Sequence, residues 1–534
     1  MDPSATFFYS QNTIPPPYEG NLSYFSGGID NSQESFYNFF SKDSPSAPLL
    51  SLQTSETPLP YFPFVWQQEE QQESVYPQKI SGARVLSRFL ATFIFLALVV
   101  VGIGKVVFTA DNPYLFLYLY GVSVTFVLLT VMFFSITRYR DPAEATDNAE
   151  NNAIAFPYPF PSAFVSCMIA VHNEEKIITR CIESFLAQTY PYKEIIFVND
   201  ASTDRTAEIL DWYASQGLIQ VIHLEKNLGK KKALGTAMLQ AQGEIFFFSD
   251  SDSVLAPDAV EKSTLIMAQR PDLGALSGHC RALNSEKNFL TKMQDSWYEG
   301  QFSVRKAFES IFGAVSCVSG PLAVFRREAI YNYIPAWEND SFLGQEFRFS
   351  TDRTLTGFVL GSRQIDAKLK KKYAGSPFVE MINYPPRDWT IAYAKSIHAW
   401  TEVPDTFTKF FKQQVRWKKS FIRNIFFTGT FYWRKPFLVS FFYYLHVLFV
   451  LMGPFIVFRH LVYLPMHGNA LSAFLYLSGI AFVGLMFSFA LKREEPTSDL
   501  WMYRPFMSLF STIFLSPLLF YSLLTIKNNV WTRG

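Results

Sequence analysis

Apolar and amphipathic runs alternate between residues 160 and 400, and this pattern predicts an α/β domain. Amphipathic stretches at Glu174–Gln188 and Thr203–Gln216 have the period of helices. Strands that alternate with helices form a mainly parallel sheet, and ligands bind beyond the carboxyl ends of its strands. We therefore expect a mixed, mainly parallel sheet. The apolar runs with the length of buried strands are Phe164–Val171, Glu194–Val198, Ile219–Leu224 and Glu244–Ser249.

Longer apolar runs on both sides of this domain predict membrane-spanning helices. They are Phe89–Phe108 and Tyr114–Ile136 within residues 85–140, and Phe437–Phe458 and Ala470–Leu491 within residues 436–492. About 20 helical residues cross the roughly 30 Å hydrocarbon core of a bilayer. Basic residues gather at the ends that face residues 160–400, and positive charge marks the cytosolic side. We expect a multi-pass membrane protein with a cytosolic α/β domain.

Two further segments follow neither pattern. Residues 401–435 mix aromatic side chains with Lys and Arg, which is typical of interfacial helices on the cytosolic face. The run from Arg504 to Ile526 is apolar enough for a fifth span, but Pro505 and Pro517 interrupt it and both of its ends are basic. We expect residues 499–526 to form a re-entrant or interfacial element, with a fifth span as the alternative.

Composition supports a membrane protein with a large soluble part. Charged residues are 17% of the 534, below the roughly 25% of soluble domains, and the mean hydropathy is +0.08. The four cysteines form no C-x-x-C pair, which excludes a disulfide framework or a zinc ribbon. The formal net charge of +1 excludes a basic coat for nucleic acid, so we expect no nucleic-acid partner.

Residues 1–84 read as a disordered acidic tail, because they are rich in Pro, Ser, Gln and Tyr and have no hydrophobic period. The first 80 residues hold nine acidic and two basic side chains, so the rest of the chain carries +8. That excess suits anionic inner-leaflet lipid and diphosphate substrates. Pro15-Pro16-Pro17-Tyr18 is weakly similar to a ligand of a WW-type module, although a chance match is the simpler explanation.

Carboxylates follow two of the predicted strands. Asp200 comes after Val198-Asn199, and Asp250 and Asp252 come after the apolar run that ends at Ser249. Two carboxylates two positions apart suit a hard divalent cation, Mg²⁺ or Mn²⁺, whose oxygen shell a substrate diphosphate completes. A solvated turn is the alternative for such a pair taken alone.

Motifs around these carboxylates resemble those of inverting family-two glycosyltransferases. The residues Gln413-Gln414-Val415-Arg416-Trp417 match the Q-x-x-R-W signature of processive membrane polysaccharide synthases. With the predicted spans, residues 85–534 resemble the hyaluronan synthases, whereas the tail does not. The other matching segments are Val165–Glu175, Gln188–Pro191, Asn227–Lys230, Ser319–Leu322 and Asp352-Arg353.

The resemblance implies a GT-A-like fold for residues 160–400, inserted between transmembrane and interfacial helices. It also implies UDP-sugar donors, a nascent polysaccharide and the bilayer as partners, and a plasma (cell) membrane location. Asp200 would contact the uridine, and Asp250 and Asp252 would hold Mg²⁺ or Mn²⁺ on the diphosphate, with Asp252 the more direct ligand. The remaining donor-site residues that the resemblance implies are Asn173, Glu174 and Lys230.

On the acceptor side, Asp352 matches the general base that takes a proton from the attacking hydroxyl. Arg416 would offset the leaving-group charge, and Trp417 would offer a flat face to a sugar. Ser319, Gly320 and Gln413 belong to the matching motifs and would bind substrate. For Arg416 and Trp417, an interfacial helix anchored in lipid headgroups is the alternative.

The chain departs from the family pattern at two places. Ser350-Thr351-Asp352 stands where Gly-Asp-Asp is common, so one carboxylate is lost and the last Asp is kept. The terminal motif, usually W-G-T-R, reads Trp531-Thr532-Arg533-Gly534. In the family this segment closes over the bound nucleotide, so residues 527–534 would be a gating motif in which Trp531 contacts substrate. A short polar tail after a membrane segment is the alternative.

The resemblance predicts a processive, inverting β-glycosyltransferase that polymerises UDP-sugars and translocates the product. The implied product is hyaluronan, made from UDP-N-acetylglucosamine and UDP-glucuronate. Three alternatives stay open at this point. They are a synthase of chitin or another β-linked homopolymer, a transferase that adds one sugar to a lipid carrier, and an inactive membrane-anchored scaffold.

Overall fold

The computed structural model describes residues 115–144, 163–494 and 498–528. Several predicted features lie outside these residues: the tail with Pro15–Tyr18, the apolar run Phe89–Phe108, and the terminal motif with Trp531. The second predicted span, Tyr114–Ile136, corresponds to helix α3, Leu115–Thr137.

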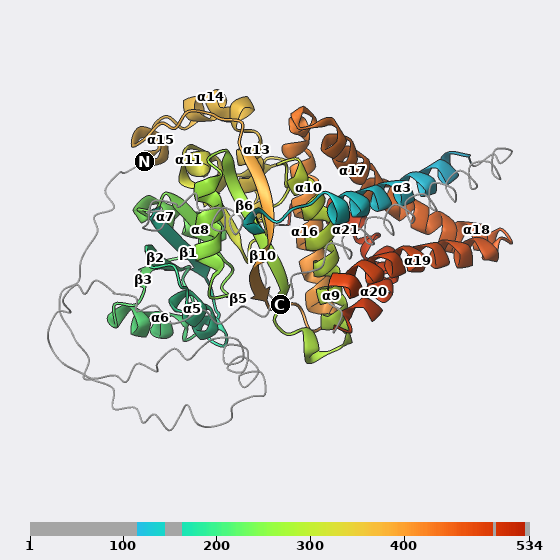
Figure 1. The fold of residues 1–534 in the computed structure, drawn as a ribbon, viewed down its shortest axis with the longest axis horizontal. Helices are drawn as coiled ribbons and strands as arrows, with labels where there is room; N and C mark the ends of the chain where they lie inside the picture. Colours follow the sequence, from blue (N-terminus) through green and yellow to red (C-terminus); the bar gives the residue numbers. More distant parts are fainter. Residues whose placement is uncertain (1–114, 145–162, 495–497, 529–534) are drawn as a thin grey trace, which may run out of the picture. The chain divides into compact units, whose positions relative to one another are not determined.

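An eight-stranded mixed sheet forms the centre of the α/β domain, in the order β3-β2-β1-β4-β7-β6-β10-β5 (Figure 1). Strands β1 to β4 run parallel to one another, and β6 runs parallel to β10. Strands β7 and β5 run antiparallel to their neighbours. The mixed, mainly parallel sheet is as the sequence predicts. Its strands are β1 Val165–Val171, β2 Lys193–Asn199, β3 Gln220–His223, β4 Ile245–Phe248, β5 Ser253–Leu255, β6 Leu273–Ala282, β7 Ala323–Arg326 and β10 Thr390–Thr401.

The helices between these strands are shorter than the amphipathic pattern predicts. Helix α5 spans Ile178–Leu186 and α6 spans Thr206–Ser215, so each begins three or four residues later than expected. After β1 the chain turns at Asn173, which has a φ of 55°. The next N–H, that of Glu174, donates to Thr206 Oγ1 at 2.8 Å. Residues 173–177 therefore form a loop at the sheet edge instead of a first helical turn.

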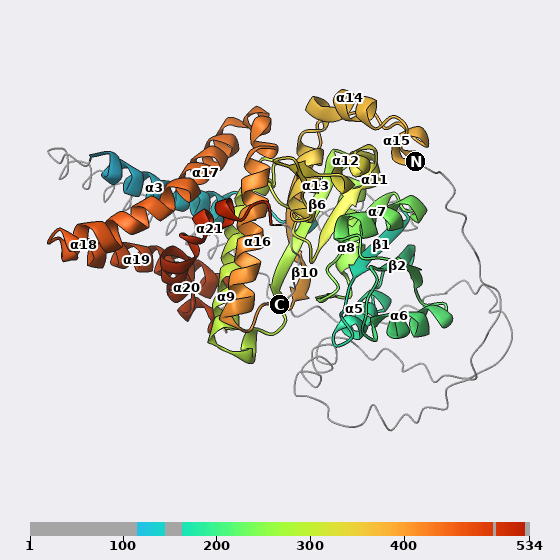
Figure 2. The same cartoon turned by 180° about the vertical axis from the view of Figure 1, so that it is seen from behind.

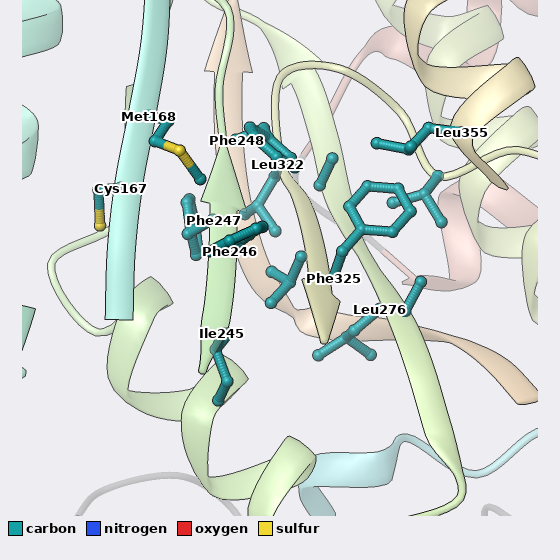
Figure 3. Close-up of a cluster of buried hydrophobic side chains, with 14 of the residues drawn as sticks. Cys167, Met168, Ile245, Phe246, Phe247, Phe248, Leu276, Leu322, Phe325 and Leu355 are labelled. Carbon is teal, nitrogen blue, oxygen red and sulfur yellow. The ribbon is translucent and has the colours of Figure 1, made fainter. Parts of the chain in front are cut away.

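Strand β4 lies in the centre of the core and is apolar on both faces (Figure 3). Phe246 and Phe247 are fully buried, and Phe248 packs edge to face on Phe246 and lies 5.8 Å from the Phe325 ring of β7. A strand that is buried on both faces needs no alternation of polar residues. Close packing on both sides holds the end of this strand, and hence Asp250 and Asp252, in place.

The remaining elements of residues 220–390 are mostly short helices that carry the chain around the sheet. A two-stranded hairpin, β8 Ser341–Phe342 with β9 Gln345–Glu346, precedes α13. The helices are α7 Lys230–Gln240, α8 Ala259–Gln269, η2 Ser285–Lys287, α9 Phe289–Gly300, η3 Gln301–Lys306, α10 Ala307–Ile311, α11 Arg327–Ile330, η4 Tyr331–Tyr333, α12 Ile334–Glu338, α13 Thr351–Leu360, α14 Ser362–Lys372 and α15 Pro377–Glu380.

Helix α16, Phe407–Ile425, carries the Q-x-x-R-W residues and runs beside α9 (Figure 2). Two short turns, η5 Thr428–Thr430 and η6 Tyr432–Arg434, lead from it to the apolar helices. The sequence predicts interfacial helices over residues 401–435, and a helix of 19 residues forms most of that range.

Two apolar helices follow that are long enough to cross a bilayer, α17 Phe437–Phe458 and α19 Ala470–Glu494. Their bounds nearly match the predicted Phe437–Phe458 and Ala470–Leu491. The connection between them is largely helical, because η7 Arg459–Tyr463 and α18 Leu464–Met466 continue the helix to Met466.

Residues 500–524 form a bent helical element. After η8, Leu500–Met502, the chain continues through α20 Arg504–Phe510, η9 Ser511–Leu515 and α21 Leu518–Leu524. The axis bends by 41° between Leu515 and Leu518, where Pro517 interrupts the helix. The Phe510 ring packs against Phe410 and Phe411 of α16, so this element covers one side of the Q-x-x-R-W helix.

The segment after α3 is fastened to strand β10. The Tyr139 hydroxyl donates to the Tyr393 carbonyl at 2.9 Å, and Asp141 Oδ2 accepts from the Ser396 N–H at 2.8 Å. Both contacts fall where β10 loses its register with β6, between Tyr393 and His398. The end of an apolar helix is thus joined directly to the sheet.

Candidate active site

The predicted site residues gather at one edge of the sheet. Asn173 follows β1, Asp200 follows β2, and Asp250 and Asp252 follow β4. Since β7 runs antiparallel to β4, the Ser319–Gly320 segment that precedes β7 reaches the same edge. This is the carboxyl edge of the parallel strands, where the sequence predicts the site.

Asp200 is buried and orders the loop that follows β3. Its Oδ1 accepts from the Leu228 N–H at 2.6 Å, and its Oδ2 accepts from the Gly229 N–H at 2.9 Å. Gly229 has a φ of 86°, which a residue without Cβ adopts at little cost, and helix α7 begins at the next residue. Asp200 therefore sets the position of the Asn227–Lys230 motif.

Asn173 and Glu174 border the same loop. Asn173 Oδ1 accepts from the Thr203 N–H at 2.7 Å, which joins the β1 loop to the β2 loop. Glu174 is buried, and Ser251, the residue between the two aspartates that follow β4, lies 3.4 Å from its Oε1. The loop after β1 thus contacts the loop after β2, which follows Asp200, and also the Asp250-Ser251-Asp252 segment after β4.

Lys230, at the first position of α7, forms an ion pair with Asp250 Oδ1. Burial lowers the pKa of Lys230, but the carboxylates of Asp250, Asp252 and Asp352 outweigh it and raise the pKa. Gly320 packs against the other side of Asp250, since a Cβ there would lie 2.9 Å from Asp250 Oδ2. The Asp250 carboxylate therefore lies between the Lys230 ammonium group and Gly320, whose lack of a Cβ avoids a steric clash.

Asp252 contacts the end of strand β10. Its Oδ1 accepts from the Thr401 hydroxyl at 3.2 Å. Burial, together with the neighbouring charge of Asp250, raises the pKa of Asp252 to about 7. Two close carboxylates in a buried setting repel each other, and a divalent cation between them would relieve that repulsion.

The residues at this edge fit a cation that also binds a diphosphate. Within the described residues, no group of three or more His, Cys, Asp or Glu side chains is arranged to hold a metal ion. Asp250 and Asp252 can supply two carboxylates, and Mg²⁺ commonly takes its other oxygens from substrate phosphates and water. The arrangement suits a metal that binds with its substrate.

Asp352 lies in the first turn of α13, and a strained residue precedes that helix. Ser350 has a φ of 68°, in the left-handed region. Its hydroxyl accepts from the Asn424 amide of α16 at 2.5 Å. Asp352 Oδ1 accepts from the Arg353 N–H at 2.8 Å, and Oδ2 faces the Cys317 thiol at 3.6 Å. Ser350, which replaces the usual Gly of the family motif, thus joins α13 to the Q-x-x-R-W helix.

Helix α16 brings Arg416 and Trp417 to the carboxylates. Burial lowers the pKa of the Arg416 guanidinium, whereas the charges of Asp252 and Asp250 raise it. The Trp417 ring lies 5.9 Å from that of Trp297 and 6.2 Å from that of Tyr298, both on α9, and remains 38% exposed. Among the described residues, Gln413 Oε1 is buried without a hydrogen-bond partner. Helix α16 thus carries a guanidinium group, an aromatic ring and a side-chain amide, those of Arg416, Trp417 and Gln413.

Two residues near Asp352 were not predicted to act in the site. Lys306 is buried and donates to Ser319 Oγ at 2.5 Å. Cys317 is half-buried, and its thiol faces Asp352 Oδ2. Burial and the Asp352 carboxylate raise the pKa of Cys317 to about 12, so it stays protonated and donates. The sequence around Lys306 has no motif that would predict its position beside Ser319.

The structure thus brings together the donor-side residues, the two aspartates after β4, Asp352, and the Arg416–Trp417 pair. The predicted contact of Trp531 lies outside the described residues.

Comparison with known proteins identifies the family to which this domain belongs. Residues 166–334 match the family model described as "Glycosyl transferase family 2". The chain carries a family 2 glycosyltransferase domain. The protein is accordingly a glycosyltransferase with a GT-A-like fold, as the sequence predicts, and the sheet edge described above is its candidate active site.

The relatives of this glycosyltransferase include polysaccharide and N-acetylglucosamine transferases. It is 27% identical over 377 residues to the hyaluronan synthase of Streptococcus pyogenes, covering 69% of this chain and 82% of that protein. It is 30% identical over 310 residues to an N-acetylglucosaminyltransferase of Rhizobium meliloti (strain 1021), covering 57% of this chain and 66% of that protein.

Among solved structures, the glycosyltransferase is similar to a mannosyltransferase from Pyrobaculum calidifontis in complex with GDP-Man and Mn²⁺. The TM-score is 0.43 at 19% identity, over 77% of this chain and 98% of that one.

Proposed function

We propose that the protein is a processive, inverting β-glycosyltransferase that polymerises UDP-sugars at the plasma membrane and passes the polymer through its own helices. The observation that supports this most is the ion pair of Lys230 with Asp250 at a place where the carboxylates of Asp252 and Asp352 also act electrostatically on Lys230. Arg416 lies within electrostatic reach of Asp252 and Asp250. A charged donor, a base and a counter-charge for the leaving group can meet there. The Q-x-x-R-W helix and the two apolar helices α17 and α19 support processive synthesis at a membrane.

In the proposed reaction Asp352 acts as the general base. It accepts the proton of an acceptor hydroxyl as that oxygen attacks the anomeric carbon of the donor. The new C–O bond forms on the face opposite the UDP, the bond from C1 to the phosphate oxygen breaks, and UDP leaves with its electrons. A base that is positioned in this way contributes about 10²–10⁴ in rate. The Cys317 thiol at Asp352 Oδ2 and the Arg353 N–H at Oδ1 hold the carboxylate.

The donor would bind along the carboxyl edge of the sheet. Asp200 and Asn173 border the pocket for the uridine, and Lys230 approaches the diphosphate. Mg²⁺ or Mn²⁺ held by Asp250 and Asp252 would offset the charge that develops on the diphosphate. Arg416 would stabilise the same charge from α16. Trp417, with Trp297 and Tyr298, offers aromatic faces to an acceptor sugar.

Hyaluronan, made from UDP-N-acetylglucosamine and UDP-glucuronate, is the product that we propose. Similarity to a hyaluronan synthase over 69% of the chain supports it. The 30% identity to an N-acetylglucosaminyltransferase favours a second candidate, a β-linked homopolymer of N-acetylglucosamine.

A UDP-release and polymer-length assay on the purified full chain tests both candidates. We expect long polymer only when both donors are present. Polymer from UDP-N-acetylglucosamine alone would establish the homopolymer instead. A product lengthened by one sugar would overturn processivity, and wild-type protein that releases UDP from neither donor would overturn the proposal as a whole.

A further inference from the structure

Lys306 is a buried lysine in an unusual setting beside the candidate active site. Its Nζ donates to Ser277 Oγ at 2.8 Å and to Ser319 Oγ at 2.5 Å, and it lies 3.9 Å from the centroid of the Phe302 ring. Among the described residues, no carboxylate forms an ion pair with it. A buried ammonium group is costly unless an anion compensates its charge. Asp352 and Glu309 act on Lys306 only without direct contact, so its ammonium group can accept a further anion.

The backbone at this position is also unusual. Gln301–Lys306 form a π-helical stretch, η3, between α9 and α10. Such stretches are rare and occur frequently at functional sites, because the wider turn redirects the side chains that it carries. Here the stretch ends at Lys306 and brings its side chain to the serines of β6 and of the loop before β7.

Lys306 contacts the segment that reaches the proposed catalytic carboxylates. Ser319 is followed by Gly320, which packs against the Asp250 carboxylate. Burial lowers the pKa of Lys306, whereas the carboxylates of Asp352 and Glu309 act on it electrostatically and favour its charged form. Both Ser319 and Cys317 are only half-buried, so this side of the seat borders solvent-accessible space.

We propose that Lys306, seated on Ser277 and Ser319, is the receptor for the carboxylate of a hexuronate unit bound between Asp250 and Asp352. This inference rests on the proposed function and specifies the substrate class of that same site. A hydrogen bond between two charged groups is about twice as strong as one between neutral groups. A neutral hexose at the same place would leave the ammonium uncompensated, and the site would therefore select an acidic sugar.

The carboxylate can come from two sources, the incoming donor sugar or the terminal sugar of the growing chain, and two assay arms separate them. The donor arm compares kcat/KM of UDP release for UDP-glucuronate and UDP-glucose, which differ only at the carboxylate. The acceptor arm compares single addition from UDP-N-acetylglucosamine onto oligosaccharides that end in glucuronate or in glucose.

The variants are Lys306→Gln, which keeps a hydrogen-bonding amide without charge, and Lys306→Arg, which keeps the charge. We expect Lys306→Gln to lower the uronate-to-glucose ratio about 10- to 100-fold in one arm, as is typical for loss of a hydrogen bond to a charged group. Lys306→Arg should lose less of the ratio. Lys371→Gln, on the exposed face of α14, is the control and should leave the ratio unchanged.

An unchanged ratio in both arms, in a Lys306→Gln protein that still releases UDP, would overturn the inference while leaving the proposed function intact. Failure of the wild type to release UDP from any donor would instead overturn the proposed function. If Lys306→Gln does not fold, Ser277→Ala and Ser319→Ala decide the matter. They remove the seat and keep the lysine, and they should lower the same ratio; a ratio equal to that of the wild type would again overturn the inference.

Discussion

The Asn424 amide of α16 donates a hydrogen bond of 2.5 Å to the hydroxyl of Ser350, two residues before Asp352. This contact joins the helix that carries Arg416 and Trp417 to the start of the helix that carries the proposed base. Ser350 adopts a left-handed conformation that a non-glycine residue rarely keeps without support. This side-chain pair therefore helps to fix the position of Asp352 relative to Arg416 and Trp417.

Asn424→Ala should lower kcat while leaving KM for the UDP-sugar nearly unchanged. Among the described residues, the side-chain hydrogen bonds of this pair stay within α13, its preceding residue and α16. A loss of about 10-fold corresponds to one buried hydrogen bond of roughly 1.4 kcal/mol in the transition state. Steady-state UDP release measures both constants. Ser350→Gly, which suits the left-handed backbone, is the matched variant and should lose less activity than Asn424→Ala. A change confined to KM would contradict this role.

Asp352→Asn should abolish most catalysis without unfolding the protein. The amide keeps the size of the side chain but cannot accept the proton of the acceptor hydroxyl, so UDP release in the presence of acceptor should fall about 10²- to 10⁴-fold. Binding of UDP, followed by calorimetry, should stay within error of the wild type. Unchanged UDP release would remove Asp352 from the role of base.

Chelation of divalent cations should stop UDP release, and added Mg²⁺ or Mn²⁺ should restore it. In Asp252→Asn, the Mn²⁺ concentration for half-maximal activity should rise by at least the roughly 10- to 100-fold typical of losing a neighbouring metal-site partner. Titration of each cation into the chelated protein gives this value. Glu208→Gln, at an exposed position of α6, is the control. Full activity in excess chelator would show that the two aspartates serve another purpose.

Asp340→Asn should destabilise the fold. Asp340 is buried and accepts from Lys231 Nζ at 2.9 Å and from Arg423 Nε at 3.1 Å, so it joins α7 to α16. Its removal leaves two buried cations without their anion, at a cost of about 3–5 kcal/mol. Thermal unfolding in detergent measures the loss. Glu208→Gln breaks an exposed pair with Arg205 and should change stability by less than about 1 kcal/mol. Equal losses of stability in the two variants would contradict the prediction that the buried Asp340 ion pairs contribute more than the exposed pair.

Glu338 should make stability depend on pH between about 5 and 7. Burial raises the pKa of Glu338 from 4.5 to about 7. The folded protein then keeps a proton that the unfolded chain has lost, so this carboxyl's contribution is present at low pH and disappears as pH rises through about 7. Glu338→Gln should give a flatter plot of melting temperature against pH, with a higher value at pH 8. Glu225→Gln, at an exposed site, should leave the slope as in the wild type.

The local pattern was enough to predict the parts of this site that depend on one strand or helix. The run Ile245–Phe248 is apolar on both faces, so its burial and the exit of Asp250 from its end follow from composition alone. Helix α17 begins and ends where the apolar run does. The late start of α5 was not predicted, because it depends on the tertiary contact between Glu174 and Thr206.

Contacts between distant segments could not be predicted for the same reason. The hydrogen bonds of Asn424 with Ser350 and of Lys306 with Ser277 join residues that are neighbours only after the sheet and α16 have packed. The π-helical turn that orients Lys306 has no local sequence signature that distinguishes it from an α-helix.

The position of β10 within the sheet also decides when the site can form during synthesis. Ser253–Leu255, directly after the two aspartates, pairs with Ala399–Thr401, and β6 pairs with the same late strand. A ribosome-bound chain that ends before residue 401 therefore has two strands without their partner, although every donor-side carboxylate has already been made. Pairings this far apart in sequence form slowly and leave strand edges open to other chains. Newly made chains are thus most open to misassembly during translation of residues 256–401, before the sheet of the α/β domain can close.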